Sequence, residues 1–153
     1  MDTAAFEGPI DCPACGARIA NLARLQWGAC PRPALYRAGD RPEWLTAPDG
    51  RPVPSHRLTG GRWNCGDPAL ADVTLKDPTL LGGPVTCASC GAKYEGFAVE
   101  LAEGRFAQAR VHAYDELEEA DAYLRDPQGR LTPLPEWQDA PILPFDASGN
   151  AEK

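Results

Sequence analysis

The clearest alternation of apolar and polar residues lies between residues 93 and 114. Two apolar-leaning runs, "KYEGFAVELA" and "RFAQARVHAY", flank Glu103 and Gly104. Such a pair of runs around a short glycine-containing turn is typical of a β-hairpin. We therefore predict a hairpin in which Leu101 and Phe106 face each other across the two strands.

Weaker patterns predict further short strands. Residues 18–27 alternate imperfectly and favour a strand, with a short helix as the alternative. Residues 34–37 and 71–77 each suit one short strand, whereas residues 38–40 and 125–131 suit turns. By contrast, the stretch "FEGPID" near the start of the chain has no strand pattern.

One segment has helical spacing. In "YDELEEADAYL", Asp115 suits the N-cap position, and glutamates follow where the helix dipole favours negative charge. Leu117, Ala120 and Leu124 then fall on one face, so we predict a helix of about ten residues. Its acidic residues fan around the helix and are expected to be solvated. The expected fold is mostly β with a short helix, of the α+β class.

Two segments have no regular period. Residues 45–72 are rich in Pro, Gly, Arg and Asp and read as an irregular insertion. We expect Trp44, Leu58 and Trp63 to anchor it. Residues 133–153 form a Pro-rich acidic tail that is expected to be disordered at its end. Its large apolar residues suit either docking on the parent domain or binding to a partner; they are Trp137, Ile142, Leu143 and Phe145.

Length and charge restrict the function classes. A chain of 153 residues suits one domain, here residues 1–132, with its own core. The net charge is -7, whereas nucleic-acid binders normally present a basic surface. Residues 32–62 are locally richer in arginine, but nucleic acid remains an unexpected partner. The N-terminal segment lacks the basic and apolar regions of a secretory signal, so we expect a cytoplasmic location without a membrane span.

The most specific signal is a phrase that occurs twice. "CPACGAR" begins at Cys12 and "CASCGAK" begins at Cys87. We call residues 12–17 the first knuckle and residues 87–92 the second knuckle. Two thiolates in a Cys-x-x-Cys turn fill two corners of a tetrahedron, and Gly after the second Cys tolerates a positive φ. Together the knuckles supply four metal ligands, which are Cys12, Cys15, Cys87 and Cys90.

The double knuckle resembles the zinc-ribbon and rubredoxin-like proteins. That resemblance implies a core of two knuckle hairpins, one Zn²⁺ per chain, and a long insertion between the halves. The chain is also similar to small uncharacterised bacterial proteins of zinc-ribbon type, in which Tyr-x-x-Gly-Asp follows the first knuckle. Here that stretch is residues 36–40. This second resemblance implies no activity.

Other metal and redox chemistries are alternatives. Iron in a rubredoxin-like electron carrier fits the same knuckles. A glutaredoxin-like redox pair is disfavoured, because such a pair follows a buried strand and opens a helix. Cys30 and Cys65 suit small buried residues, with a second metal site together with His56 and His112 as the alternative. On its own, His56 is expected to be exposed and His112 to be a half-buried structural residue.

The expected function is non-catalytic. A closed four-cysteine zinc site leaves no position for water or substrate. The sequence has no Ser-His-Asp order, P-loop or dinucleotide fingerprint. We therefore expect no enzyme, but a zinc-binding interaction or adaptor module whose partner is another protein. A nucleic-acid-binding zinc ribbon and an iron electron carrier are the alternatives.

Overall fold

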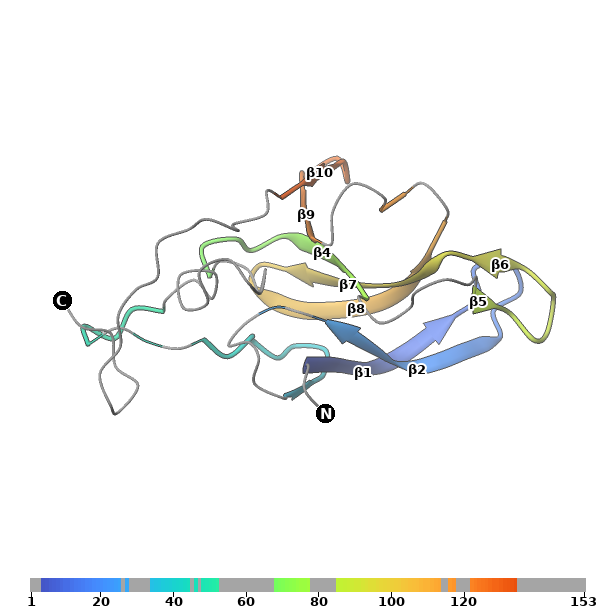
Figure 1. The fold of residues 1–153 in the computed structure, drawn as a ribbon, viewed down its shortest axis with the longest axis horizontal. Helices are drawn as coiled ribbons and strands as arrows, with labels where there is room; N and C mark the ends of the chain where they lie inside the picture. Colours follow the sequence, from blue (N-terminus) through green and yellow to red (C-terminus); the bar gives the residue numbers. More distant parts are fainter. Residues whose placement is uncertain are drawn as a thin grey trace.

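The computed structural model describes residues 4–25, 27, 34–44, 46, 48–52, 68–77, 85–113, 116–117 and 122–134. These residues form ten strands in three sheets and contain no helix (Figure 1). In chain order the strands are β1 Ala4–Asp11, β2 Arg18–Leu25, β3 Leu35–Tyr36, β4 Val73–Lys76, β5 Val85–Thr86, β6 Lys93–Tyr94, β7 Gly96–Ala102, β8 Arg105–His112, β9 Ala122–Arg125 and β10 Leu131–Pro133.

The first sheet has the strand order β2-β1-β3, with β1 antiparallel to β2 and parallel to β3. The expectation that "FEGPID" is no strand was wrong, because these residues belong to β1. The register shifts between Glu7 and Ile10, so Gly8 and Pro9 lie at a bulge, where proline is tolerated in a strand. A Cβ at Gly8 would lie 2.7 Å from the Phe6 ring. The bulge interrupts the alternation of buried and exposed residues along β1, so the sequence pattern does not reveal the strand.

The second sheet has the order β10-β9-β4-β7-β8 and contains the predicted hairpin. Leu101 pairs with Phe106, as the pattern predicted. Glu103 and Gly104 have φ angles of 54° and 78°, so both turn residues are in the left-handed region that a type I′ turn requires. The predicted strands at β2, β3 and β4 and the predicted turns at 38–40 and 125–131 are also confirmed.

The two larger sheets pack face to face, with β1 against β8 and β2 against β7 (Figure 1). Their inner side chains form one apolar core. Phe106 belongs to this core: its ring stacks on that of Tyr36 with centroids 4.4 Å apart, and its centroid lies 6.0 Å from that of Phe6. Trp44 packs edge-on against the buried Trp27 at the edge of this core. Among the described residues, none of those in this core lies in either knuckle turn.

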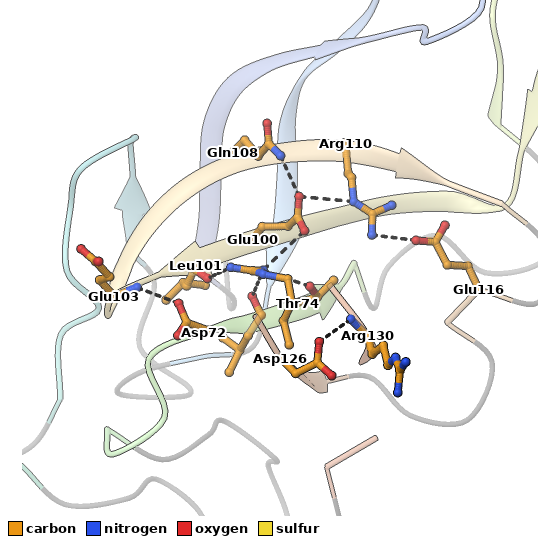
Figure 2. A network of polar contacts seen from close by, with 12 residues as sticks. Asp72, Thr74, Glu100, Leu101, Glu103, Gln108, Arg110, Glu116, Asp126 and Arg130 are labelled. Atoms are coloured by element: carbon orange, nitrogen blue, oxygen red, sulfur yellow. Dashed lines mark hydrogen bonds and ion pairs between the residues drawn. The ribbon is translucent and has the colours of Figure 1, made fainter. Parts of the chain in front are cut away.

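The outer face of the five-stranded sheet carries a polar network (Figure 2). The Glu100 carboxylate accepts a hydrogen bond from the side-chain amide of Gln108 at 2.7 Å. It also forms ion pairs with Arg110 at 3.3 Å and with Arg125 at 3.4 Å. Arg110 also pairs with Glu116 at 2.7 Å. The Glu100 side chain is only 14% exposed, so these pairs are screened less than surface pairs. The network ties the segment after β8 to the sheet.

The helix predicted over residues 115–124 is not seen where the structure describes this segment, at residues 116–117 and 122–124, and residues 115 and 118–121 lie outside the described part. The last part of the segment belongs to β9, where Ala122 and Tyr123 are buried and pair with β4. Leu117 is buried against Ala98 and Tyr123. Glu116 is exposed, as expected for an acidic residue of this segment, and it accepts a hydrogen bond from the Ala113 amide and pairs with Arg110. Strand pairing with β4 and β10 outweighs the local helical spacing, and the described part of the chain is all-β rather than α+β.

The predicted domain limits stay predictions. Most of the 45–72 insertion, with Leu58 and Trp63, lies outside the described residues, as does the tail from residue 135 onward. Pro133 and Leu134 lie within the described part, and Leu134 packs partly buried against the core. Among the described residues, no helix is long and apolar enough to cross a membrane.

Candidate metal centre

Each knuckle is the turn of a β-hairpin, as the sequence predicted. The first knuckle joins β1 to β2, and the second joins β5 to β6, a small sheet of its own. The two hairpin tips lie beside each other at one end of the molecule (Figure 1). Chain segments more than seventy residues apart therefore meet at one place.

The two turns have the same backbone hydrogen bonds. In the first, the Cys12 amide donates to the Ala17 carbonyl at 2.8 Å, and the Gly16 amide donates to the Cys12 carbonyl at 2.7 Å. In the second, the Cys87 and Gly91 amides make the equivalent bonds, both at 2.8 Å. The φ angles of Gly16 and Gly91 are 79° and 80°, which explains why glycine follows the second cysteine in both phrases.

The four sulfurs converge. The Cys12 and Cys90 Sγ atoms are 3.7 Å apart, the Cys15 and Cys87 Sγ atoms are 3.6 Å apart, and all four lie within 4.8 Å of one another. Four sulfurs at about 2.3 Å from one zinc ion would be separated by about 3.8 Å in a regular tetrahedron. The observed spacing fits one ion bound by two thiolates from each knuckle.

Burial alternates within each pair. Cys12 and Cys87 are 1% and 2% exposed, whereas Cys15 and Cys90 are exposed. Water can therefore solvate the second sulfur of each knuckle but reaches the first much less. A buried thiolate needs protein donors or a cation to stabilise its charge.

Cys12 has such a donor outside its own turn. The Tyr94 hydroxyl, on β6, lies 3.1 Å from Cys12 Sγ. This hydrogen bond, together with the amides of Cys15 and Ala14 and against the effect of burial, lowers the pKa of Cys12 from 9.0 to about 6. The same bond raises the pKa of Tyr94 to about 12. A thiolate can only accept a hydrogen bond, so with Cys12 ionised the Tyr94 hydroxyl is the donor of this pair.

In the second knuckle, the pKa values of the two thiols shift in opposite directions. The amides of Cys90 and Ser89 lower the pKa of Cys87. For Cys90, the Ala92 amide favours the thiolate, but the neighbouring thiols, that of Cys15 first, together with partial desolvation within the cluster outweigh it and raise the pKa to about 12. Four clustered thiols cannot all ionise without a compensating cation. A divalent cation would displace the remaining protons on binding.

The donor set fits a metal that prefers four thiolates, such as zinc or iron. The knuckle amides stabilise the negative sulfurs, and no chain rearrangement is needed to bring the two halves together. One feature of a glutaredoxin-like pair is missing, because strand β2 and not a helix follows the first knuckle, although strand β1 does precede it.

The other candidate residues lie elsewhere or outside the described residues. His112 is 2% exposed on β8, more buried than expected, and its Nδ1 lies 3.2 Å from the Ala113 carbonyl. Burial lowers its pKa. It does not belong to the four-cysteine group. Cys30, Cys65 and His56 fall outside the described residues, so the proposed second site with them stays a prediction.

Sequence reasoning missed Tyr94. A signal for it was present, since the two phrases can be aligned beyond the cysteines. The seventh residue after the first cysteine is Ile19 in one copy and Tyr94 in the other. The two halves of the site therefore differ at this position, because only Tyr94 carries a hydroxyl.

Comparison of the chain with protein-family models, with curated proteins and with solved structures finds no match. The functional argument therefore rests on the geometry of the site itself.

Proposed function

We propose that the protein is a non-catalytic zinc-binding protein in which Cys12, Cys15, Cys87 and Cys90 hold one Zn²⁺ per chain. The observation that carries this proposal is the convergence of the four sulfurs at tetrahedral spacing. Zinc is the metal found most often in closed four-cysteine structural sites. The ion would join the β1–β2 hairpin to the β5–β6 hairpin.

A structural role is favoured over a catalytic one. Four thiolates complete the tetrahedron and leave no position for water or substrate. Active sites usually lie in concave pockets. A groove of about 690 Å³ runs beside β1 and β8, but none of the four cysteines lines it. We propose that the protein acts in the cytoplasm as an interaction or adaptor module for another protein.

An iron electron carrier is the second candidate, because the same four-thiolate group accepts iron. Metal analysis together with a visible absorption spectrum of the purified protein separates the two. We expect one zinc per chain and no visible absorption. A coloured protein with one iron per chain would favour the second candidate, and a protein without bound metal would contradict both.

A salt titration of nucleic-acid binding tests the choice of partner. Phosphate contacts require a converging basic surface, and the net charge of -7 opposes one. We expect no submicromolar binding to mixed DNA or RNA pools at about 0.15 M salt. Tight binding that weakens as salt rises would replace the protein partner with nucleic acid.

A further inference from the structure

Tyr94 and Ile19 occupy equivalent positions in the two halves of the site, seven residues after Cys87 and Cys12 respectively. Both side chains are partly buried and pack against the core. Only Tyr94 carries a hydroxyl, and this hydroxyl lies 3.1 Å from Cys12 Sγ, in the opposite knuckle. Packing therefore accounts for an apolar side chain at either position, but not for the phenol.

The Cys12 sulfur is the one that most needs such a partner. Cys12 is 1% exposed, so solvent contributes little to its stabilisation, whereas Cys15 and Cys90 are exposed. A hydroxyl that donates to a buried thiolate supplies the hydrogen bond that water cannot. Because Tyr94 belongs to β6, the bond also links the second hairpin to a ligand of the first.

We propose that Tyr94 is a positioning residue of the metal centre, whose hydroxyl holds the Cys12 sulfur in its coordinating place. This inference depends on the proposed metal-binding function. Partners that hydrogen-bond to metal ligands orient those ligands and tune the metal. Here the partner is one tyrosine that acts on one of four sulfurs, so the site is electronically asymmetric although the two turns have matching backbones.

The test is the variant Tyr94→Phe, which keeps the ring and removes only the hydroxyl. We expect zinc affinity to fall by about 10–100-fold, measured by competition with a chelator of known affinity. Ile19→Leu is the matched control, because it changes an apolar side chain at the equivalent position of the other half. Its zinc affinity should equal that of the wild type.

A second readout separates positioning from general destabilisation. In the cobalt(II)-substituted protein, thiolate-to-cobalt charge-transfer bands report on the electron density at the sulfurs. Tyr94→Phe should shift these bands and Ile19→Leu should not. Unchanged affinity and bands in Tyr94→Phe, with normal metal binding by the wild type, would overturn the role of Tyr94 and leave the proposed function intact. A wild-type chain that binds neither zinc nor cobalt would overturn both.

Discussion

The first knuckle lies at the tip of two eight-residue strands, whereas the second lies at the tip of two strands of two residues each. Strand β1 contributes Phe6 and Ile10 to the core, and β2 contributes Ala23 and Leu25. In β5–β6, only Val85 and Tyr94 pack, partly buried, against the core. The same cysteine motif therefore lies on two long, well-packed strands in one copy and on two very short strands in the other.

The difference separates two contributions to the site. The local turn is set by the phrase itself, since the amide bonds and the glycine φ angles agree in both copies. The stability of each turn depends on the strands beneath it. A hairpin with two residue pairs is marginal alone. We therefore expect the metal to matter more for the second knuckle than for the first.

Loss of one ligand should have the largest effect. Cys87→Ser removes the buried ligand of the weakly supported knuckle. Structural zinc sites in small peptides contribute about 10–16 kcal/mol of apparent binding free energy, so the variant should lose most of its zinc and melt at a lower temperature. Metal analysis and thermal unfolding measure both effects.

Ser89→Ala is the control for this variant, because Ser89 is exposed in the same turn and offers no sulfur. It should keep full zinc content. Full zinc content and unchanged melting in Cys87→Ser would falsify the ligand assignment.

Removal of the metal from the wild type should affect the two knuckles unequally. After treatment with a chelator, amides of residues 85–94 should exchange with solvent at least about tenfold faster than in the metal-bound protein, since local opening is governed by local contacts. Amides of β1 and β2 should stay protected by their pairing and by the core. Hydrogen exchange with mass spectrometry resolves both segments. Equal loss of protection in the two knuckle hairpins would contradict the claim that the second depends more on the metal.

The anchor of the first hairpin should have a smaller but measurable effect. Asp77 follows β4, is 5% exposed, and accepts the Arg24 amide of β2 at 3.0 Å. Asp77→Ala leaves this amide without its acceptor and should reduce the free energy of unfolding by about 1–3 kcal/mol. Asp77→Asn keeps an acceptor oxygen and should cost less. Chemical denaturation measures the order, and a reversed order would contradict the role of this contact.

The knuckle glycines should have the smallest effect. Gly16→Ala and Gly91→Ala each place a side chain in the left-handed region at a cost of roughly 1–2 kcal/mol. Because the turns match, both should weaken zinc binding to a similar extent. Gly129→Ala has the same strain, at a φ of 83° in the β9–β10 turn, and should lower stability without changing zinc affinity. If Gly129→Ala also lowered the zinc affinity, the loss in the knuckle variants could not be assigned to the knuckle turns themselves.

The sequence predicted the elements whose signals are local. The β7–β8 hairpin follows from alternation around Glu103 and Gly104, and the cysteine cluster follows from the repeated spacing. Two elements were not predictable in this way. The bulge at Gly8 and Pro9 conceals β1, and β9 depends on pairing with β4, whose residues lie about fifty positions earlier. The Tyr94–Cys12 contact also depends on how the two hairpins meet.

X-ray absorption spectroscopy of the purified protein tests the central claim most directly. The account predicts an absorption edge of zinc and a first shell of four sulfurs at about 2.3 Å. Nitrogen or oxygen neighbours at about 2.0–2.2 Å, or fewer than four sulfurs, would contradict the four-cysteine centre formed by the two knuckles.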